Sequence, residues 1–297
     1  MDKRIGMIGL GQMGKWMALN MLKREFDLTV LDINPAALTS LTGEGARAAA
    51  TPADLASQTD WIFLSLLDAS VVEQVIFGAD GLIEGGRAGQ IIVDLGTTAY
   101  MTTLELGRRL EEKGIHFADS PVSGMEARAR EGTLTIMFGG DEAVFQQLTP
   151  VFEAIGNLSL YMGGLGSGQL TKLINQLLYN INIAAIAEVL PMSVKLGLDP
   201  EKVLNVVTTG TGRSFAAEFF GPRILEGRFN DAFPLKHAYK DMVSATEISA
   251  QRKIPLPLVH AATTTYQMAL AAGYGDNDKG AMIKVFENIL GVAFRKK

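Results

Sequence analysis

The first half of the chain alternates short apolar runs with segments whose apolar residues repeat at the spacing of a helix. The runs predicted to be strands are 5–8, 28–31, 61–66, 90–94, 116–119, 134–138 and 158–162. The helices predicted between them are 14–24, 35–42, 70–77, 102–113 and 142–152. This order is typical of a mostly parallel sheet with helices on both faces.

The pattern changes after a glycine-rich segment at 163–168. From there to the end no convincing strand is expected, and the predicted helices are 169–196, 200–208, 213–225, 237–252, 257–272 and 278–293. We therefore predict two domains. An α/β domain occupies residues 1–164, and an all-α domain occupies residues 165–297.

Composition narrows the class of protein. With 47% hydrophobic and 20% charged residues, the chain is expected to form a globular core. Cys is absent, which excludes disulfides and cysteine nucleophiles. The 27 basic and 32 acidic residues leave a net charge of −5, whereas nucleic-acid binding normally needs a basic excess. His116, His237 and His260 are far apart in the sequence, so we predict no metal site.

Neither a targeting segment nor a membrane span is expected. The chain enters its first apolar run at Ile5, with no pattern of a signal or transit peptide before it. The longest apolar stretch, 170–198, includes Lys172, Glu188 and Lys195, which predicts that it is too polar to span a membrane. We expect a cytoplasmic protein with no membrane partner.

The segment Gly9-Leu-Gly11-Gln12-Met13-Gly14 fits the pattern G-x-G-x-x-G between a predicted strand and a predicted helix. In this context the glycines allow a tight turn, a close approach of backbone to a pyrophosphate, and close packing of helix on strand. The helix N-terminus offers free N–H groups to the phosphates. The segment predicts a Rossmann-like dinucleotide site, and a glycine-rich turn without a ligand is the alternative.

Asp32 ends the second predicted strand. A carboxylate here accepts hydrogen bonds from the ribose hydroxyls of a dinucleotide and repels a 2′-phosphate. The residues that follow, Ile33, Asn34 and Pro35, offer no arginine to such a phosphate. The sequence thus favours NAD over NADP, unless Asp32 only begins a turn.

Two loops follow the third and fourth predicted strands, and ligands in this architecture bind beyond the carboxyl ends of the strands. Leu66 and Leu67 lie in the first loop, and Thr97 lies in the second. We expect both loops to line the cofactor cleft. Thr97 is either a polar contact near the nicotinamide or a helix-capping residue.

Pro and Gly mark a turning loop after the strand predicted at 116–119. In this loop Ser123 and the backbone N–H groups of Gly124 and Met125 could hold a small anion such as a carboxylate. Taken by itself, the segment is more typical of a turn than of a binding site.

The helix expected from residue 169 carries a polar stripe between strongly apolar flanks. The stripe has the spacing i, i+3, i+4, i+7 and i+8, and its members are Lys172, Asn175, Gln176, Tyr179 and Asn180. Such a helix is expected to be mostly buried, so the stripe faces a ligand cleft, a partner helix or solvent. A buried charge must be paired or functional, and a lysine of lowered pKa suits acid/base catalysis.

Four segments in this order resemble the motifs of the short β-hydroxyacid dehydrogenases, a family that includes 3-hydroxyisobutyrate dehydrogenase and tartronate semialdehyde reductase. Gly6–Gly14 is similar to the cofactor motif and Asp119–Gly124 to the substrate-binding motif. Gly168–Asn175 is similar to the catalytic motif, and Lys240-Asp241 to a pair near the cofactor. The resemblance covers essentially the whole chain. It implies a Rossmann domain joined by a long helix to a helical domain, in a homodimer or homotetramer.

The resemblance also implies a role for each of these residues. Lys172 is then the general acid/base on the substrate oxygen, and Asn175 orients the substrate. Ser123 and Gly124 hold the substrate carboxylate, and the pair Lys240-Asp241 helps to close the site around the nicotinamide. The implied reaction transfers a hydride between NAD and a small 3-hydroxy acid, such as 3-hydroxyisobutyrate or glycerate, whose semialdehyde is tartronate semialdehyde.

Some positions depart from the family pattern. Met125 stands where the family usually has a second glycine, and a bulky side chain there bears on which substrate fits. Leu67 and Gly96 replace a usual proline and serine, and Gln176 replaces the second of two asparagines.

Three alternatives stay open at this point. One is a reductase whose substrate carries a sulfonate or phosphate in place of the carboxylate. Another is an imine reductase of similar architecture, against which Lys172 argues because those relatives commonly lack the lysine. The third is a non-catalytic NAD-binding module, which the presence of Lys172 and Asn175 on one helix face disfavours.

Overall fold

The computed structural model describes residues 3–296 of the chain. They form two compact units, of which the first ends at Lys172 and the second begins at Leu173. One helix, α9 (Ser167–Lys195), contributes its first residues to the N-terminal unit and the rest to the C-terminal unit. The division into domains after residue 164 stays a prediction of the sequence.

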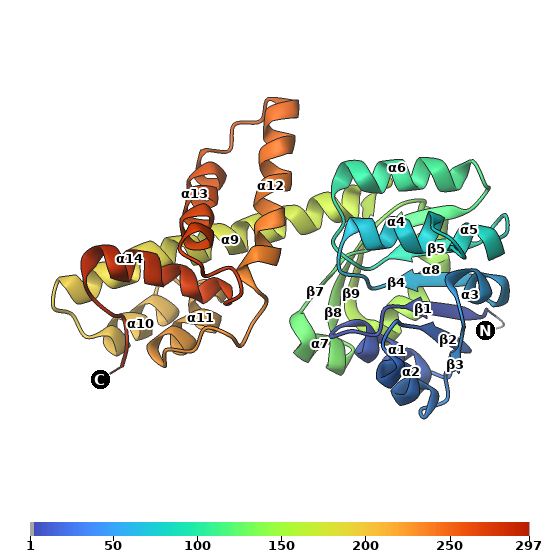
Figure 1. Cartoon of the computed structure of the whole chain (residues 1–297), viewed down its shortest axis with the longest axis horizontal. Helices are drawn as coiled ribbons and strands as arrows, with labels where there is room; N and C mark the ends of the chain where they lie inside the picture. Colours follow the sequence, from blue (N-terminus) through green and yellow to red (C-terminus); the bar gives the residue numbers. More distant parts are fainter. Residues whose placement is uncertain (1–2, 297) are drawn as a thin grey trace. The chain divides into compact units, whose positions relative to one another are not determined.

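A mostly parallel sheet forms the centre of the N-terminal unit (Figure 1). Among the described residues it has nine strands: β1 (Ile5–Ile8), β2 (Leu28–Leu31), β3 (Arg47–Ala48), β4 (Trp61–Leu64), β5 (Ile91–Asp94), β6 (His116–Asp119), β7 (Val122–Ser123), β8 (Leu134–Gly139) and β9 (Gly156–Gly163). Their order is β3-β2-β1-β4-β5-β6-β8-β7, with β9 paired to β8. The strands from β3 to β6 are parallel, whereas β8 runs antiparallel to β6 and β7.

Helices cover both faces of this sheet because its central strands are apolar on both sides. Met7 and Phe63 face one layer of helices, and Ile8 and Leu64 face the other. The first layer contains α1 (Gly14–Lys23), α2 (Pro35–Thr42), α7 (Met125–Glu131) and α8 (Glu142–Ile155). The second contains α3 (Pro52–Gln58), α4 (Ala69–Phe77), α5 (Leu82–Gly85) and α6 (Tyr100–Glu111). The Rossmann-like α/β architecture predicted from the sequence is confirmed.

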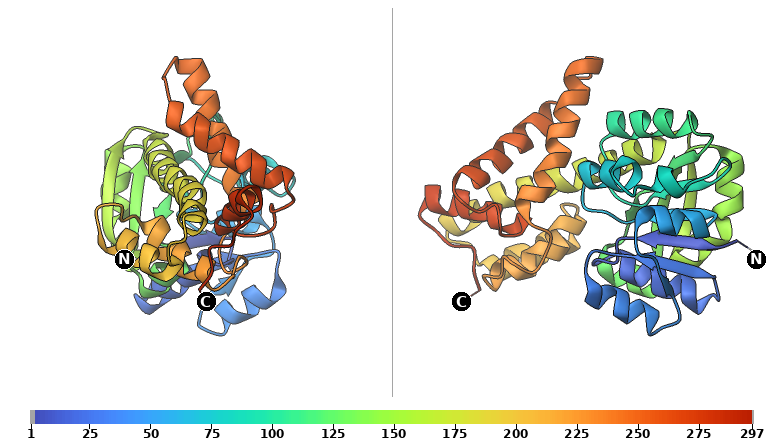
Figure 2. Two further views of the ribbon diagram at one scale, coloured as in Figure 1. Left: turned by 90° about the vertical axis from the view of Figure 1, so that its left-hand side faces the viewer. Right: turned by 45° about the vertical axis from the view of Figure 1, so that its right-hand side comes forward.

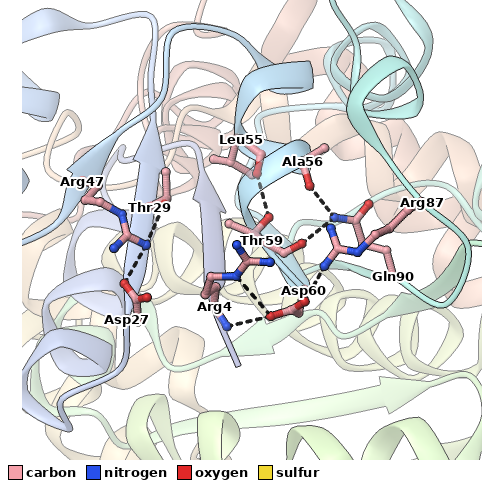
Figure 3. Close-up of polar contacts among 10 residues, drawn as sticks. All are labelled: Arg4, Asp27, Thr29, Arg47, Leu55, Ala56, Thr59, Asp60, Arg87 and Gln90. Atoms are coloured by element: carbon pink, nitrogen blue, oxygen red, sulfur yellow. Dashed lines mark hydrogen bonds and ion pairs between the residues drawn. The ribbon is translucent and has the colours of Figure 1, made fainter. Parts of the chain in front are cut away.

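A polar network ties the amino ends of the strands together (Figure 3). Asp60, just before β4, accepts hydrogen bonds from the backbone N–H of Arg4 (3.0 Å) and pairs with the guanidinium of Arg87. The buried side chain of Gln90, just before β5, donates to two carbonyl groups at the end of α3 and the turn after it (both 2.9 Å). This edge is thereby held by fixed contacts, and the carboxyl ends of the strands carry the loops expected to bind ligands.

The C-terminal unit is helical around its own core. Besides the end of α9 it contains α10 (Pro200–Thr209), α11 (Phe215–Leu225), α12 (Leu235–Arg252), α13 (Pro257–Ala271), the 3₁₀ turn η1 (Lys279–Met282) and α14 (Ile283–Leu290). Helices α12 and α13 lie side by side and are joined by a short turn (Figure 2). Phe220 and Tyr266 are fully buried in the core of this unit.

One polar cluster lies inside this helical core. The side-chain oxygen of Asn180 accepts hydrogen bonds from the Tyr266 hydroxyl and the Lys279 ammonium group, both at 3.0 Å. The ammonium group of Lys279 also lies 3.7 Å from the centre of the Tyr179 ring. Part of the polar stripe of α9 is therefore used to pack the C-terminal unit.

The polar residues of α9 do not make its composition different from that of a membrane-spanning helix. The most apolar 18-residue window of this helix has a mean hydropathy of 1.5, and 44% of the window is buried. By length and composition alone, the helix is long and apolar enough to cross a bilayer. Our expectation that the stretch is too polar was therefore wrong by composition. Part of the helix is a core element, with Ile183 and Ala187 fully buried among α11 to α14, but Ile174 and Leu178 are each 61% exposed, so the expectation of a mostly buried helix was wrong.

Several short elements were absent from the sequence prediction: β3, α3, α5, β7 and α7. The segment 119–127, predicted to be a turning loop, contains both β7 and the start of α7. The last predicted helix, 278–293, is divided into η1 and α14. An isolated bridge between Pro234 and Asp278 is the small exception to a strand-free C-terminal unit in the described chain.

Phe152 provides a test of the hydrophobic core of the N-terminal unit. It is buried on α8 and packs against the rings of Phe138 and Phe145 at centroid distances of 5.8 and 5.9 Å. Phe152→Ala should lower the free energy of unfolding by about 3–5 kcal/mol because it leaves a cavity. Urea unfolding measures this, and Ile33→Ala, at a fully exposed position of the same unit, should change it by less than about 0.5 kcal/mol.

Candidate active site

The glycine loop between β1 and α1 leaves room for a phosphate group at its middle glycine. Gly9 has φ +91°, and a Cβ added there would lie 2.3 Å from the Ser65 carbonyl oxygen. A Cβ added to Gly14 would lie 1.9 Å from the Gly9 carbonyl oxygen, whereas one added to Gly11 meets no described atom within 4 Å. The loop thus turns at Gly9, packs tightly at Gly14 and is open at Gly11, as a pyrophosphate-binding loop requires.

The two residues between the last glycines line the same loop. Gln12 is exposed and Met13 is half-buried. Met13 is the N-cap of α1, and its side chain makes no capping hydrogen bond. No side chain therefore caps the start of α1, and the Lys15 N–H donates to the Gly11 carbonyl at 3.2 Å.

Asp32 lies beside this loop, directly after β2. Its carboxylate accepts hydrogen bonds from the backbone N–H groups of Leu10 (2.6 Å) and Asn34 (2.7 Å). The alternative of a turn-forming aspartate is therefore part of what it does. Its hydrogen bond to Leu10 also fixes a carboxylate next to the glycine loop, where the ribose of a dinucleotide is expected.

The loops after β4 and β5 lie at the carboxyl edge of the sheet, as predicted. Leu66 is half-buried, and Leu67 is 85% exposed. Thr97 is half-buried, and the N-cap of α6 is Ala99, two residues further on. The β5 loop is fixed by the buried carboxylate of Asp94, which accepts hydrogen bonds from Gly96 N–H (2.8 Å) and the Thr98 hydroxyl (2.6 Å).

The predicted substrate loop is partly regular structure. Val122 and Ser123 form β7, which pairs antiparallel with β8, and α7 begins directly after Gly124. Gly124 has φ +148°, and exposed Met125 has φ +60°, a left-handed conformation uncommon for a long side chain. The segment is therefore a strand, a strained corner and a helix start.

Lys172 is directed toward this segment. Its ammonium group donates a hydrogen bond to the Val122 carbonyl oxygen at 2.9 Å, and the residue is only 9% exposed. This contact lies within the N-terminal unit and places the ammonium group at the backbone of the residue before Ser123. Asn175, one helical turn further along α9, is exposed.

The other predicted site residues belong to the C-terminal unit. Lys240 is half-buried on α12, and Asp241 next to it is 6% exposed. The Asp241 carboxylate accepts a hydrogen bond from the Gln176 side chain at 3.3 Å, which links α12 to α9. The role of Lys240 and Asp241 in closing the site stays a prediction.

Sequence analysis gave no role to Asp119, which ends β6. Its carboxylate accepts hydrogen bonds from the backbone N–H groups of Gly166 and Gln169, both at 2.6 Å, at the start of α9. Burial raises the pKa of Asp119 to about 6, the charge of Asp94 acts in the same direction, and the two N–H groups oppose them. The signal available in the sequence was that two successive predicted strands both end in aspartate. In the structure these strands are neighbours, and Asp94 and Asp119 are register partners.

Glu126 was missed as well. Its carboxylate accepts hydrogen bonds from the side chains of Trp16 (3.0 Å) and Gln12 (2.9 Å), which hold the pKa of Glu126 below its ordinary value. Arg130 lies over the Trp16 ring, 5.1 Å from its centre. These contacts tie α7 to the glycine loop and α1, across more than a hundred residues of sequence that give no local signal.

Comparison with known proteins agrees with this architecture. Residues 4–164 match the family described as the NAD-binding domain of 6-phosphogluconate dehydrogenase. Residues 166–286 match the family described as NAD-binding of NADP-dependent 3-hydroxyisobutyrate dehydrogenase. The fold, its glycine loop and these matches define an NAD(P)-dependent oxidoreductase.

Individual relatives extend over nearly the full chain. The chain is 38% identical to 2-(hydroxymethyl)glutarate dehydrogenase of Eubacterium barkeri, over 98% of this chain and 97% of that protein. It is 34% identical to 2-hydroxy-3-oxopropionate reductase of Escherichia coli, over 96% and 97%. The chain belongs to the 3-hydroxyisobutyrate dehydrogenase family of β-hydroxyacid dehydrogenases.

Solved structures give the same result. A crystal structure of 3-hydroxyisobutyrate dehydrogenase from Salmonella typhimurium superposes with a TM-score of 0.87 at 30% identity, covering 96% of this chain and 100% of that one. An imine reductase from Myxococcus stipitatus superposes with a TM-score of 0.64 at 19% identity, over 96% and 99%. The second likeness establishes a shared fold alone.

The raised pKa of Asp119 makes a stability prediction. The unfolded chain ionises this group near 3.8 and the folded chain near 6, so the folded state holds the proton more tightly, and wild-type stability falls as pH rises through this interval. Asp119→Asn removes this dependence. The stability of the variant relative to wild type should therefore improve by on the order of 3 kcal/mol from about pH 4 to about pH 7.

Urea denaturation of both proteins at a series of pH values measures this difference. A difference that is constant across the pH range, or that shrinks as pH rises, would contradict a raised pKa for Asp119.

Proposed function

We propose that this protein reversibly oxidises a small 3-hydroxy acid to the matching semialdehyde, with NAD as its preferred cofactor. The observation that carries the proposal is the position of the Lys172 ammonium group, 2.9 Å from the Val122 carbonyl and next to Ser123. A buried amine on a helix, held at the strand that carries the Ser123 hydroxyl, is suited to exchange a proton with a substrate that this hydroxyl would anchor.

Ser123 and the backbone at Gly124 would hold the substrate carboxylate. This leaves the neighbouring hydroxyl-bearing carbon within reach of Lys172, which would take the hydroxyl proton during oxidation and return it during reduction. Asn175, on the same helix, would orient the substrate. A bound nicotinamide supplies the hydride acceptor or donor, and the glycine loop and Asp32 would hold its dinucleotide.

The names of two relatives support the substrate class. A 2-(hydroxymethyl)glutarate and a 2-hydroxy-3-oxopropionate both carry the reacting carbon one position away from a carboxylate-bearing carbon. The same spacing describes the proposed 3-hydroxy acid and its semialdehyde. Met125 would narrow the space beside the carboxylate, because its long side chain stands in the corner between β7 and α7.

The preference for NAD rests on Asp32. Its carboxylate is fixed by Leu10 N–H, so it would stay beside the ribose and repel a 2′-phosphate. The adjacent Ile33 is fully exposed and offers no charge to such a phosphate. The guanidinium of Arg47, on the next strand, pairs with Asp27 at 2.7 Å, so this positive charge is already matched by a carboxylate of the protein.

Lys172→Ala tests the proposed reaction. We expect kcat to fall by about 10²–10⁴-fold while NADH still binds, because the variant loses the acid/base but keeps the glycine loop. The assay is a panel of 3-hydroxy acids with NAD and the matching semialdehydes with NADH, extended to a sulfonated analogue and a cyclic imine. Lys195→Ala is the matched control, since Lys195 is exposed at the far end of the same helix and donates to the Leu290 carbonyl.

Each outcome of this assay bears on one of the functions considered above. Near-full turnover in Lys172→Ala would refute the role of the lysine. Turnover of the imine or the sulfonated compound alone would replace the substrate class, and no turnover of any compound by the wild type would favour a non-catalytic module.

Asp32→Ala tests the cofactor preference. The loss of a charge-assisted hydrogen bond, worth about 1.5–3 kcal/mol, should raise the KM for NAD by about tenfold or more and relax discrimination against NADP. Glu84→Ala removes an exposed carboxylate on α5 and leaves the Arg47–Asp27 pair intact, so it is the control and should leave the preference unchanged. Steady-state kinetics with both cofactors measure it, and an unchanged NAD to NADP ratio in Asp32→Ala would count against the assignment.

A further inference from the structure

We propose that Asp119 is the positioning residue of Lys172. By this inference, which rests on the proposed function, its carboxylate fixes the first turn of α9 so that the lysine faces the Val122–Ser123 strand. Asp119 does not contact the substrate in this scheme and acts through the helix backbone.

The first support is the pair of hydrogen bonds at the start of α9. The first N–H groups of a helix have no partner within the helix. Asp119 accepts from two N–H groups there, Gly166 and Gln169, with one carboxylate oxygen for each. The residue is fully buried, so solvent does not compete for these contacts, and a negative charge at a helix N-terminus is favourable.

The second support is that the same backbone segment holds both the helix start and the acceptor of the lysine. Asp119 ends β6, and Val122 lies three residues later. Between them, Ser120 N–H donates to the Asp94 carbonyl (2.7 Å) and Met137 N–H donates to the Pro121 carbonyl (3.1 Å). These two hydrogen bonds tie the segment to β5 and β8 and thereby restrain the separation between the carboxylate that sets the helix and the carbonyl that receives the ammonium group.

Gln169 adds a third anchor to this turn. Its side-chain amide donates to the Gly96 carbonyl at 3.0 Å, beyond the end of β5. Gln169 and Lys172 are three residues apart on the helix and thus on neighbouring positions of one face. The first turn of α9 is therefore tied to the ends of β5, β6 and β7, with Asp119 holding its backbone.

Two glycines keep this contact close. A Cβ added to Gly139 would lie 2.6 Å from an Asp119 carboxylate oxygen and 2.7 Å from the Gly168 nitrogen. A Cβ added to Gly168 would lie 2.2 Å from the Met137 carbonyl oxygen and 2.8 Å from the other carboxylate oxygen of Asp119. A side chain at either position would push the helix away from the carboxylate.

The test begins with Asp119→Asn, which keeps the shape of the side chain but leaves one helix N–H facing an amide N–H. We expect kcat to fall by about 10- to 100-fold, which is the effect of moving the Lys172 ammonium group by up to about 1 Å from its position beside the substrate. The NADH dissociation constant, measured by fluorescence titration, should stay near the wild-type value. A merely structural role would instead lower bound NADH and kcat together.

A double-mutant cycle with Lys172→Ala tests whether Asp119 acts through the lysine. If it does, Asp119→Asn lowers the residual rate of the Lys172→Ala enzyme little further, since groups that act as a unit are not additive. An equal fold-loss in both backgrounds, or no loss in either, overturns the proposal. Near-full turnover in Lys172→Ala alone overturns the proposed function instead.

Gly139→Ala is the second variant, which keeps the carboxylate group but crowds both that group and the Gly168 backbone, so that the start of α9 cannot approach as closely. It should lower kcat as Asp119→Asn does. The matched control is Gly156→Ala at the other end of the β8–β9 pair. A Cβ added there would lie 2.5 Å from the Leu134 carbonyl oxygen, and none of its three nearest atoms belongs to α9. Equal kcat for Gly139→Ala and Gly156→Ala, once both are corrected for the folded fraction, also overturns the proposal.

Discussion

The contact on which the arrangement of the site depends is the carboxylate of Asp119 against the backbone of α9. A buried carboxylate is costly unless its oxygens accept hydrogen bonds, and here the N–H groups of a helix start satisfy both oxygens. The same contact joins the sheet to the helix that carries Lys172. An element that begins in one compact unit and continues through the other thereby has its first turn defined by the first unit alone.

Close backbone packing at glycines serves both parts of the site. At the cofactor loop, Gly9 and Gly14 bring β1, α1 and the β4 loop within a distance that no side chain tolerates, and Gly11 leaves an open surface. At the start of α9, Gly139 and Gly168 allow the helix to approach the end of β6. The glycines of the β1–α1 loop leave space for the anionic group of a bound ligand. The glycines at the start of α9 leave space that the carboxylate of Asp119 occupies.

Local patterns predicted most of the central strands, because these are apolar on both faces, and they predicted the glycine loop and the helix carrying Lys172. They failed where a structure depends on distant partners. The two-residue strand β7 exists through its pairing with β8, and Glu126 meets Gln12 across the fold. For α3 a local signal was present, since Thr51 caps it and Pro52 begins it. For Asp119 the sequence showed only that two predicted strands both end in aspartate, because its contact with the start of α9 joins residues 47 positions apart.

The polar network around Asp60 and Gln90 has a consequence for how such a protein diversifies. It holds the strands at the edge opposite the loops, so the alignment of the sheet does not rely on the residues that meet ligands. If Met125 lies beside the substrate as proposed, the side chain at this corner can change in the course of evolution without loosening the scaffold, and new substrate preferences can arise on an unaltered frame.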